Sequence, residues 1–273
     1  MQSRDNAGLA LILSASNCTA ERWRFILVSH RPPAPSAASV HINDVTLLRG
    51  STPVFTRLTL QLNEQRIGLI GDNGAGKSSL FRMVCGLDSP QSGSVLVRNI
   101  EAGAVSAKRP GMVGMMFQNP DEQIIFPTVE EELALGLSPR GMSRRAAIAE
   151  ARVFLESRGL AAWAARSIAG LSQGQRQHVC WLALLIASPE LLLLDEPFAS
   201  LDLPGQALLD ADIAKVPQQV IVSTHLLDHV QHFGRVIWLD KGQVRADGPG
   251  ASVCDAYRAD VATRVAAHAL SVQ

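Results

Sequence analysis

The chain has 273 residues, and its 25 basic side chains are balanced by 25 acidic ones. This balance argues against nucleic acid or an anionic membrane surface as the partner, because both attract strongly basic proteins. The most apolar region, residues 179–194, is interrupted by Ser188, Pro189 and Glu190, so it is too short to cross a bilayer. We expect a soluble protein that can still dock onto a membrane partner.

The first 39 residues differ in composition from the rest of the chain. Residues 31–39 consist mainly of proline, alanine and serine, which is the composition of a linker. Residues 9–15 are apolar but form too short a run for a secretory signal. We expect residues 1–39 to be a disordered extension, or the product of a start codon placed too early.

From residue 40 onward, short apolar or alternating runs predict strands. In the first half these expected strands span residues 40–48, 55–62, 66–70, 92–97 and 113–117. A helix is expected after the third of them, ending near Gly86.

The second half of the chain alternates helices with strands. One helix is expected between Ser143 and Gly159, and another over residues 173–187. The expected strands that follow span residues 191–194, 220–223, 236–239 and 243–245. Strands that alternate with helices around a parallel sheet predict a protein of the α/β class.

A glycine-rich stretch between a strand and a helix carries the strongest functional signal. Residues 71–78 match the pattern G-x4-G-K-[ST] of a phosphate-binding loop. The loop's backbone N–H groups and the positive end of the helix dipole favour bound phosphate. Lys77 is expected to reach the β- and γ-phosphates of a nucleoside triphosphate, and the Ser78 hydroxyl to bind Mg²⁺. The predicted nucleotide-binding residues here are Gly71, Asp72, Asn73, Gly74, Ala75, Gly76, Lys77, Ser78 and Ser79.

Two carboxylates follow the apolar run at residues 191–194. Asp195 and Glu196 are expected at the carboxyl end of a buried strand, the edge of a parallel sheet where the phosphate loop also lies. We expect Asp195 to hold Mg²⁺ and Glu196 to take a proton from an attacking water. A bound cation would offset the cost of desolvating the two acids.

Four further segments occur in the order found in ATP-binding cassette (ABC) ATPases. Residues 171–177, Leu-Ser-Gln-Gly-Gln-Arg-Gln, resemble the signature motif of that family. Residues 200–202 resemble its D-loop, residues 223–225 the segment of its switch histidine, and Gln118 its Q-loop glutamine. The resemblance implies a P-loop nucleoside triphosphatase fold with a RecA-like core, a small antiparallel β subdomain and an α-helical subdomain.

The resemblance also implies boundaries for these parts. We expect the ABC ATPase domain to span residues 40–255 and its helical subdomain to span about residues 127–186. Residues 256–273 would form a C-terminal tail.

The family resemblance assigns roles to several of these residues. Ser172, Gly174 and Gln175 would contact the nucleotide bound to a second subunit, because a helix N-terminus attracts phosphate. Two ATP molecules would then be sandwiched in a head-to-tail dimer, expected to be a homodimer, with Asp202 bridging the subunits. His225 would contact the γ-phosphate and orient the water. The expected catalytic residues are Glu196, His225, Lys77 and Gln118, and the expected metal ligands are Ser78, Gln118 and Asp195.

The stretch that would bind adenine departs from the family pattern. Family members usually stack the base on an aromatic residue, whereas this chain has Leu47, Leu48, Arg49 and Gly50 at the equivalent place. Arg49 could stack its guanidinium on the purine or could be a solvated arginine of a turn, and the sequence leaves both readings open.

Residues 117–132 resemble a narrower group, the ATPases of energy-coupling-factor importers, which take up vitamins and transition metals. In that group this segment lines the groove into which a membrane subunit inserts a coupling helix. Exposed Ile124, Ile125 and Phe126 beside two acids would suit a partly apolar, basic helix. The alternative is ordinary packing of these apolar residues inside the helical subdomain.

The resemblance is strongest to ATPases of biotin importers, and cobalt or nickel uptake is the alternative. The expected partners are a second ATPase subunit, an integral membrane coupling subunit and a substrate-binding membrane subunit, without nucleic acid. We expect a peripheral protein on the cytoplasmic face of the inner membrane. A soluble ABC ATPase of DNA repair or translation is less favoured, because those chains usually carry two cassettes or long coiled-coil insertions. A scaffold that does not hydrolyse ATP is disfavoured by the presence of Lys77, Asp195, Glu196 and His225.

Overall fold

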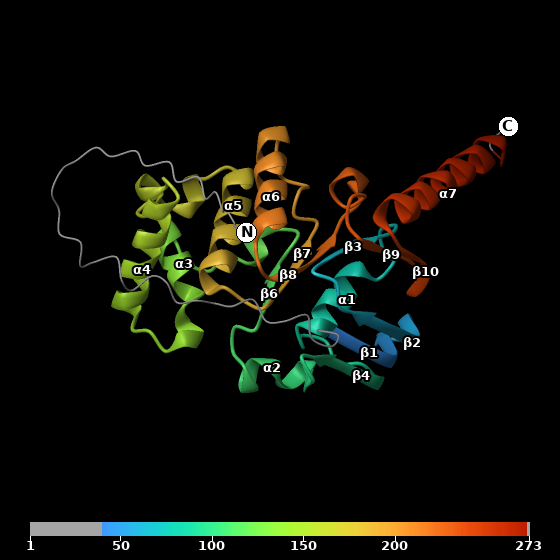
Figure 1. The fold of residues 1–273 in the computed structure, drawn as a ribbon, viewed down its shortest axis with the longest axis horizontal. Coiled ribbons are helices and arrows are strands. Elements are labelled where there is room, and N and C mark those ends of the chain that lie inside the picture. Colours follow the sequence, from blue (N-terminus) through green and yellow to red (C-terminus); the bar gives the residue numbers. More distant parts are fainter. Residues whose placement is uncertain (1–39, 272–273) are drawn as a thin grey trace, which may run out of the picture. The chain divides into compact units, whose positions relative to one another are not determined.

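The computed structural model describes residues 40–271, so the expectations for residues 1–39 lie outside the described range. Two β-sheets and a set of helices make up this range (Figure 1). None of the helices in this range has the length and apolar character of a membrane span.

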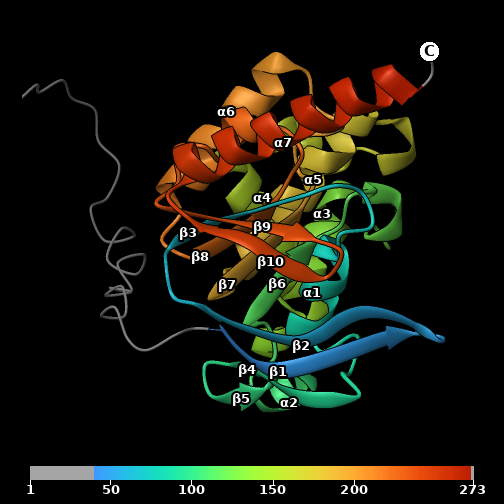
Figure 2. The same cartoon turned by 90° about the vertical axis from the view of Figure 1, so that its right-hand side faces the viewer.

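The first sheet is antiparallel and has the strand order β2-β1-β4-β5. Its strands are β1 (Val40–Arg49), β2 (Thr52–Leu62), β4 (Ser92–Val97) and β5 (Ile100–Glu101). Buried residues alternate with exposed ones along the second half of β2, as expected for a sheet with one face in the core. Figure 2 shows this sheet below the second sheet, with helix α1 between them.

The second sheet carries the candidate site. Its order is β10-β9-β3-β8-β7-β6, and all pairings are parallel except that of β10 with β9. The strands are β3 (Arg66–Ile70), β6 (Val113–Met116), β7 (Leu191–Asp195), β8 (Gln219–Ser223), β9 (Arg235–Asp240) and β10 (Gln243–Gly248). Strands β7 and β8 are buried along their whole length, which explains their continuous apolar sequences.

Seven α-helices lie in the described range. They are α1 (Lys77–Val84), α2 (Ala102–Lys108), α3 (Val129–Leu135), α4 (Arg144–Ser157), α5 (Gln173–Ala187), α6 (Leu203–Lys215) and α7 (Gly250–Ser271). Short 3-10 helices are η1 (Pro120–Glu122), η2 (Ser138–Arg140), η3 (Ala161–Trp163), η4 (Ile168–Gly170) and η5 (Leu227–His229).

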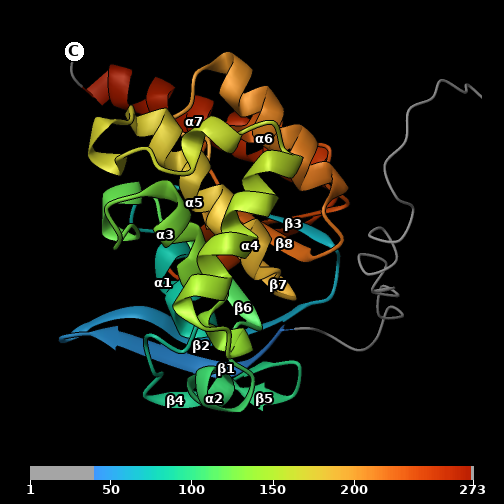
Figure 3. The same ribbon diagram turned by 90° about the vertical axis from the view of Figure 1, so that its left-hand side faces the viewer.

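The described residues form three hydrophobic clusters. One fills the space between the two sheets around Leu80 and Phe81 of α1. Another covers the opposite face of the parallel sheet and includes Trp181 of α5 and Leu209 of α6. The last joins α3, α4 and α5 (Figure 3) and runs from Val129 to Ile186.

The predicted α/β class is confirmed, and most expected strands and helices lie within a few residues of their predicted bounds. Ser143 caps α4 as expected, its hydroxyl accepting a hydrogen bond from the N–H of Ala146 at 3.3 Å. Helix α6 was not predicted, because Leu203 and Leu208 are exposed and obscure its amphipathic pattern.

The expected domain end at residue 255 falls inside α7. Val253 and Cys254 of this helix are buried in the same cluster as Trp238 of β9, and Tyr257 packs against that cluster. The helix therefore docks on the parallel sheet and continues through the residues expected to form a tail.

Candidate nucleotide-binding site

A cleft of about 780 Å³ lies at the carboxyl edge of the parallel sheet. It gathers most of the residues that the sequence predicts for nucleotide binding and catalysis. Its lining residues are Arg49, Val54, Gly71, Asp72, Asn73, Gly74, Gly76, Lys77, Ser78, Ser79, Gln118, Asp195, Glu196, His225 and Tyr257. Such a crevice beyond the ends of parallel strands is the usual ligand site of an α/β sheet.

The phosphate loop requires glycine at two positions for steric reasons. Gly71 has φ +142°, and a Cβ atom there would lie 2.1 Å from the carbonyl oxygen of Leu239 in β9. Gly76 has φ +107°, and its Cβ would lie 2.7 Å from the ring of Phe55. The loop is closed by a hydrogen bond from the N–H of Ala75 to the carbonyl oxygen of Asp72 at 3.1 Å. The loop is therefore wedged between the two sheets.

The start of α1 is arranged to bind an anion. Its N-cap is Gly76, which makes no side-chain hydrogen bond to the first N–H groups of the helix, and Lys77, Ser78 and Ser79 of this first turn line the cleft. Lys77 is only 7% exposed, and its Nζ atom donates to the carbonyl oxygens of Gly71 at 2.8 Å and Asp72 at 3.2 Å. The ammonium group is thus curled over the loop, where it can meet a phosphate.

Asp195 ends β7 beside Ser223 of β8. Its Oδ1 atom is buried and has no hydrogen-bond partner in the structure, which fits an oxygen that serves a cation directly or through water. Among residues 40–271, no group of three or more His, Cys, Asp or Glu side chains is placed to hold a metal. A cation at Asp195 would therefore take its other ligands from hydroxyl, amide, water or phosphate oxygens.

Glu196 and His225 form a hydrogen-bonded pair at the end of β7 and β8. The backbone of Glu196 has φ +48°, and its N–H donates to the carbonyl oxygen of Ser223 at 2.8 Å. Its Oε2 atom accepts from the backbone N–H of His225 at 3.2 Å and lies 2.8 Å from the imidazole Nδ1. The Glu196 side chain is buried while that of His225 is 57% exposed, so the second imidazole nitrogen remains available to the cleft.

The signature and D-loop residues do not line this cleft. Among its described lining residues, Ser172, Gly174, Gln175 and Asp202 are absent. Ser172 instead caps α5: its hydroxyl accepts from the N–H of Gln175 at 3.2 Å, and the Gln175 side chain accepts from the N–H of Ser172 at 3.1 Å. Asp202 caps α6 by accepting from the N–H of Gly205 at 3.0 Å. Two of the N–H groups at the start of α5, those of Ser172 and Gln175, therefore already have hydrogen-bond acceptors within the chain.

The segment after Gln118 differs from expectation in the exposure of its apolar residues. Ile125 is 72% exposed, but Ile124 and Phe126 are half-buried, so the expected row of three exposed apolar residues is wrong. Asp121 forms an ion pair with Arg176 of α5 at 3.0 Å while its side chain remains 61% exposed, so its place opposite a basic partner helix stays a prediction.

Glu132, which the sequence reading passed over, shapes the same segment. Its side chain is only 4% exposed, and its Oε2 atom accepts from the N–H groups of Ile125 at 2.9 Å and Phe126 at 2.8 Å. Three consecutive glutamates indicate the start of a helix but do not reveal which one turns inward.

Arg49 ends β1 at the rim of the cleft, where its guanidinium forms an ion pair with Asp88 at 3.4 Å. Its side chain is more than half exposed, so this pair contributes little stability. This contact holds the guanidinium beside the cleft. The sequence alone allowed either a solvated arginine of a turn or an arginine that stacks on the base.

Tyr257 of α7 is a further cleft residue that the sequence reading did not select. Its hydroxyl donates to the Oδ1 atom of Asp72 in the phosphate loop at 2.6 Å. The only sequence signal was that it is the single tyrosine of the chain.

Comparison with known proteins defines the class. Residues 55–199 match the profile of the ABC transporter family, and the chain belongs to that family. It is therefore an ATP-binding and ATP-hydrolysing subunit, as the sequence reading predicted.

Individual members of the family show which transporters have the most similar ATP-binding proteins among those compared. The biotin transport ATP-binding protein BioM of Rhodobacter capsulatus is 47% identical over 80% of this chain and 94% of its own length. The energy-coupling factor transporter ATP-binding protein EcfA of Methanoculleus marisnigri is 38% identical over 68% of this chain and 69% of its own. A solved ATP-binding cassette, a dimer in a post-hydrolysis state with ADP and phosphate, shares 25% identity and a TM-score of 0.67, covering 77% of this chain and 98% of its own.

We predict that Gly71→Ala abolishes ATP binding, because the new Cβ would collide with the backbone of β9. The matched control is Gly141→Ala, where φ is +70° but no atom lies within 4 Å of the added Cβ. The control is expected to cost about 1 kcal/mol in unfolding free energy from backbone strain alone and to keep nucleotide binding. Binding of a fluorescent ATP analogue and urea denaturation measure both effects. Normal ATP binding by Gly71→Ala would contradict the close contact with Leu239.

Proposed function

We propose that this chain is the ATP-hydrolysing subunit that powers biotin uptake by an energy-coupling-factor importer, bound to the cytoplasmic face of the inner membrane. The observation that carries the proposal is the cleft itself. It brings together the phosphate loop, Asp195 and the Glu196–His225 pair, while the signature residues lie outside it. Biotin as the solute is supported by the identity to BioM over nearly the whole length of that protein.

Mg²⁺ is the cation we assign to the cleft. Ser78 follows Lys77 in the first turn of α1 and lines the cleft together with Gln118 and Asp195, so a hydroxyl, an amide and a carboxylate group surround one space. These oxygen ligands suit Mg²⁺, which supplies charge neutralisation on the phosphates when bound. The unpartnered Oδ1 atom of Asp195 supports its place in this set.

Glu196 is the residue we assign as the general base. Both contacts from His225 go to its Oε2 atom, which fixes the carboxylate and leaves Oε1 as the atom to accept a proton from water. His225 holds Glu196 through Nδ1, so its Nε2 is the nitrogen we assign to the γ-phosphate. Lys77 attracts the β- and γ-phosphates.

A second copy of the chain would complete the site. Ser172, Gly174 and Gln175 stand at the start of α5 and do not line their own cleft. Ser172 and Gln175 bond to each other there, so the donors we assign to a nucleotide of another subunit are the remaining N–H groups of the first turn and the Ser172 hydroxyl proton. We propose a head-to-tail homodimer with two ATP molecules between the subunits and Asp202 at the junction. The solved dimer of a related cassette supports this arrangement.

Residues 118–126 are the segment we assign to coupling. Gln118 lines the nucleotide cleft, Asp121 is bound to Arg176 of the signature motif, and Ile125 is exposed. Phe126 lines a smaller pocket of about 200 Å³ between α3 and α4. These contacts would move the exposed Ile125 when the nucleotide cleft and helix α5 change position relative to each other. We propose that a coupling helix of the membrane subunit docks there.

We predict that Glu196→Gln slows ATP hydrolysis by roughly a hundredfold or more, because the amide cannot accept the proton of the attacking water. ATP binding should persist, and an ATP-dependent dimer should accumulate in size-exclusion chromatography with light scattering. Glu150→Gln, a change of the same kind at an exposed position of α4, is the control. Wild-type turnover by Glu196→Gln would remove this residue from the role of base.

We predict that Ile125→Asp uncouples the ATPase from its membrane subunits without affecting ATP binding by the isolated chain. The charge would be placed in the apolar contact we assign to the coupling helix. Val153→Asp is the control for a general effect of the charge, because Val153 is an exposed apolar residue of α4 in the helical subdomain. Co-purification with the membrane subunits and their stimulation of ATP hydrolysis are the measurements. Equal behaviour of the two variants would place the docking site elsewhere.

The solute is tested with the assembled transporter in lipid vesicles. We expect ATP-dependent uptake of radiolabelled biotin, and no uptake of cobalt or nickel ions. Uptake of either metal in place of biotin would assign the chain to metal import. Failure to assemble with any membrane subunit would favour an ABC ATPase that is not linked to transport.

A further inference from the structure

An acidic side chain lies within the phosphate loop, where the bound ligand is itself strongly negative. Asp72 is the second residue of the loop, and Lys77 of the same loop donates to its backbone carbonyl oxygen at 3.2 Å. An ionised carboxylate at this place can weaken phosphate binding in two ways. It can repel the phosphates, or it can pair with Lys77 and remove the ammonium group from them.

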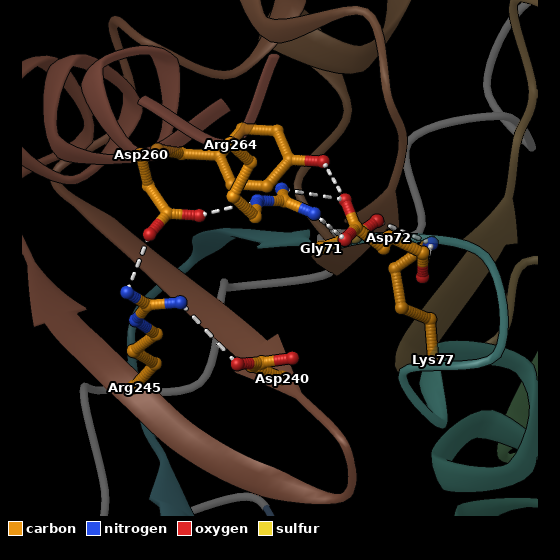
Figure 4. A network of polar contacts seen from close by, with 8 residues as sticks. Gly71, Asp72, Lys77, Asp240, Arg245, Asp260 and Arg264 are labelled. Atoms are coloured by element: carbon orange, nitrogen blue, oxygen red, sulfur yellow. Dashed lines mark hydrogen bonds and ion pairs between the residues drawn. The ribbon is translucent and has the colours of Figure 1, made fainter. Parts of the chain in front are cut away.

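The structure shows a third arrangement, in which α7 holds the carboxylate. Arg264 donates from its two terminal nitrogens to the Oδ2 atom of Asp72 at 2.6 Å and to its Oδ1 atom at 3.2 Å. Tyr257 donates to Oδ1 at 2.6 Å. Both carboxylate oxygens are therefore occupied by donors from α7, whereas the Lys77 ammonium bonds only to backbone carbonyls of the loop (Figure 4).

The donors themselves are fixed by neighbouring groups. Asp260, one turn before Arg264 on α7, pairs with the Nε atom of Arg264 at 2.8 Å. Arg245 of β10 binds Asp260 and Asp240, so the row of charges extends from the β9–β10 hairpin to the phosphate loop (Figure 4). The ring of Tyr257 packs edge-on against Trp238 of β9 with 5.2 Å between centroids. A bidentate arginine held in this way fixes both the position and the orientation of its carboxylate.

The ionisation states agree with this arrangement. The hydrogen bonds from Arg264 and then from Tyr257 lower the pKa of Asp72, and the nearby charges of Arg264 and Lys77 lower it further, so its carboxylate stays charged. Burial and the hydrogen bond to Asp72 raise the pKa of Tyr257 to about 12, so its hydroxyl stays protonated and continues to donate.

We propose that Tyr257 and Arg264 are positioning residues of the nucleotide site: they hold the Asp72 carboxylate away from Lys77 and from the triphosphate. This places α7 in the ATP-binding apparatus, although its residues follow all the family motifs in the chain. The proposal rests on the assignment of residues 71–78 as the triphosphate-binding loop.

The test is a double-mutant cycle on the full chain, with binding of a fluorescent ATP analogue in the presence of Mg²⁺ as the readout. Arg264→Gln is expected to weaken binding by about tenfold in the wild-type background, because it frees one negative charge beside the phosphates. In the Asp72→Asn background the same change is expected to weaken binding by less than about twofold. Tyr257→Phe should show the same dependence on residue 72, with a smaller effect, and Arg264→Lys should recover part of the loss.

Two controls make the outcome specific. Arg258→Gln alters the same helix at a residue that pairs with Asp228 and Asp255 and does not contact the loop, so it should leave binding unchanged. Thermal denaturation followed by circular dichroism identifies any variant that loses its fold. If Arg264→Gln is unfolded, Arg264→Lys replaces it in the double-mutant cycle.

The proposal is overturned if Arg264→Gln leaves ATP binding unchanged, or if it weakens binding equally with aspartate and asparagine at position 72. The latter result would mean that Arg264 contacts the nucleotide or supports the fold independently of Asp72. Lys77→Ala separates this failure from a failure of the proposed function. Normal ATP binding by Lys77→Ala would show that the loop itself is misassigned. If Lys77→Ala loses ATP binding but Arg264→Gln keeps it, only the role of α7 is rejected.

Discussion

The close approach of Gly71 to the carbonyl oxygen of Leu239 is the contact on which the site depends. It fixes the phosphate loop against β9, with a gap that only a hydrogen atom can occupy at the Cα of Gly71. The contact of Gly76 with Phe55 fixes the other end of the loop against the antiparallel sheet. Lys77 follows Gly76 directly and begins α1, so these two contacts fix the segment from which its side chain reaches the cleft.

The parallel strands then determine what the loop faces. Because β3, β7 and β8 run in the same direction, the residues that follow them meet at one edge. Asp195, Glu196 and His225 reach the cleft in this way, and the left-handed backbone of Glu196 is tied to Ser223 of the neighbouring strand. Such backbone strain is found at functional sites because the surrounding structure can maintain it.

Two sets of ionic contacts connect the cleft with the rest of the chain. The pair between Asp121 and Arg176 joins the segment after Gln118 to the signature helix. The network around Asp72 joins the phosphate loop to α7. Exposed ion pairs add little to stability, so the consequence of these contacts is geometric: they set where a loop lies when nucleotide and partner bind. In the function proposed above, these contacts link the nucleotide cleft to the surfaces assigned to a second copy and to a membrane subunit.

Local sequence patterns were sufficient for the parts of the protein built from consecutive residues. The phosphate loop, the acids at the end of β7, the cap Ser143 and the α/β class were predicted because each depends on spacing within one turn, one strand or one loop. Contacts between distant residues were decided only by the tertiary structure. Tyr257 and Asp72 are 185 positions apart, and no local pattern links them. Glu132 and its neighbours Glu130 and Glu131 look alike in sequence, and only the packing of the helical cluster buries Glu132 beneath the backbone of Ile125. A motif specifies which chemical groups are present, whereas the choice of their partners requires the long-range packing that brings separate segments together.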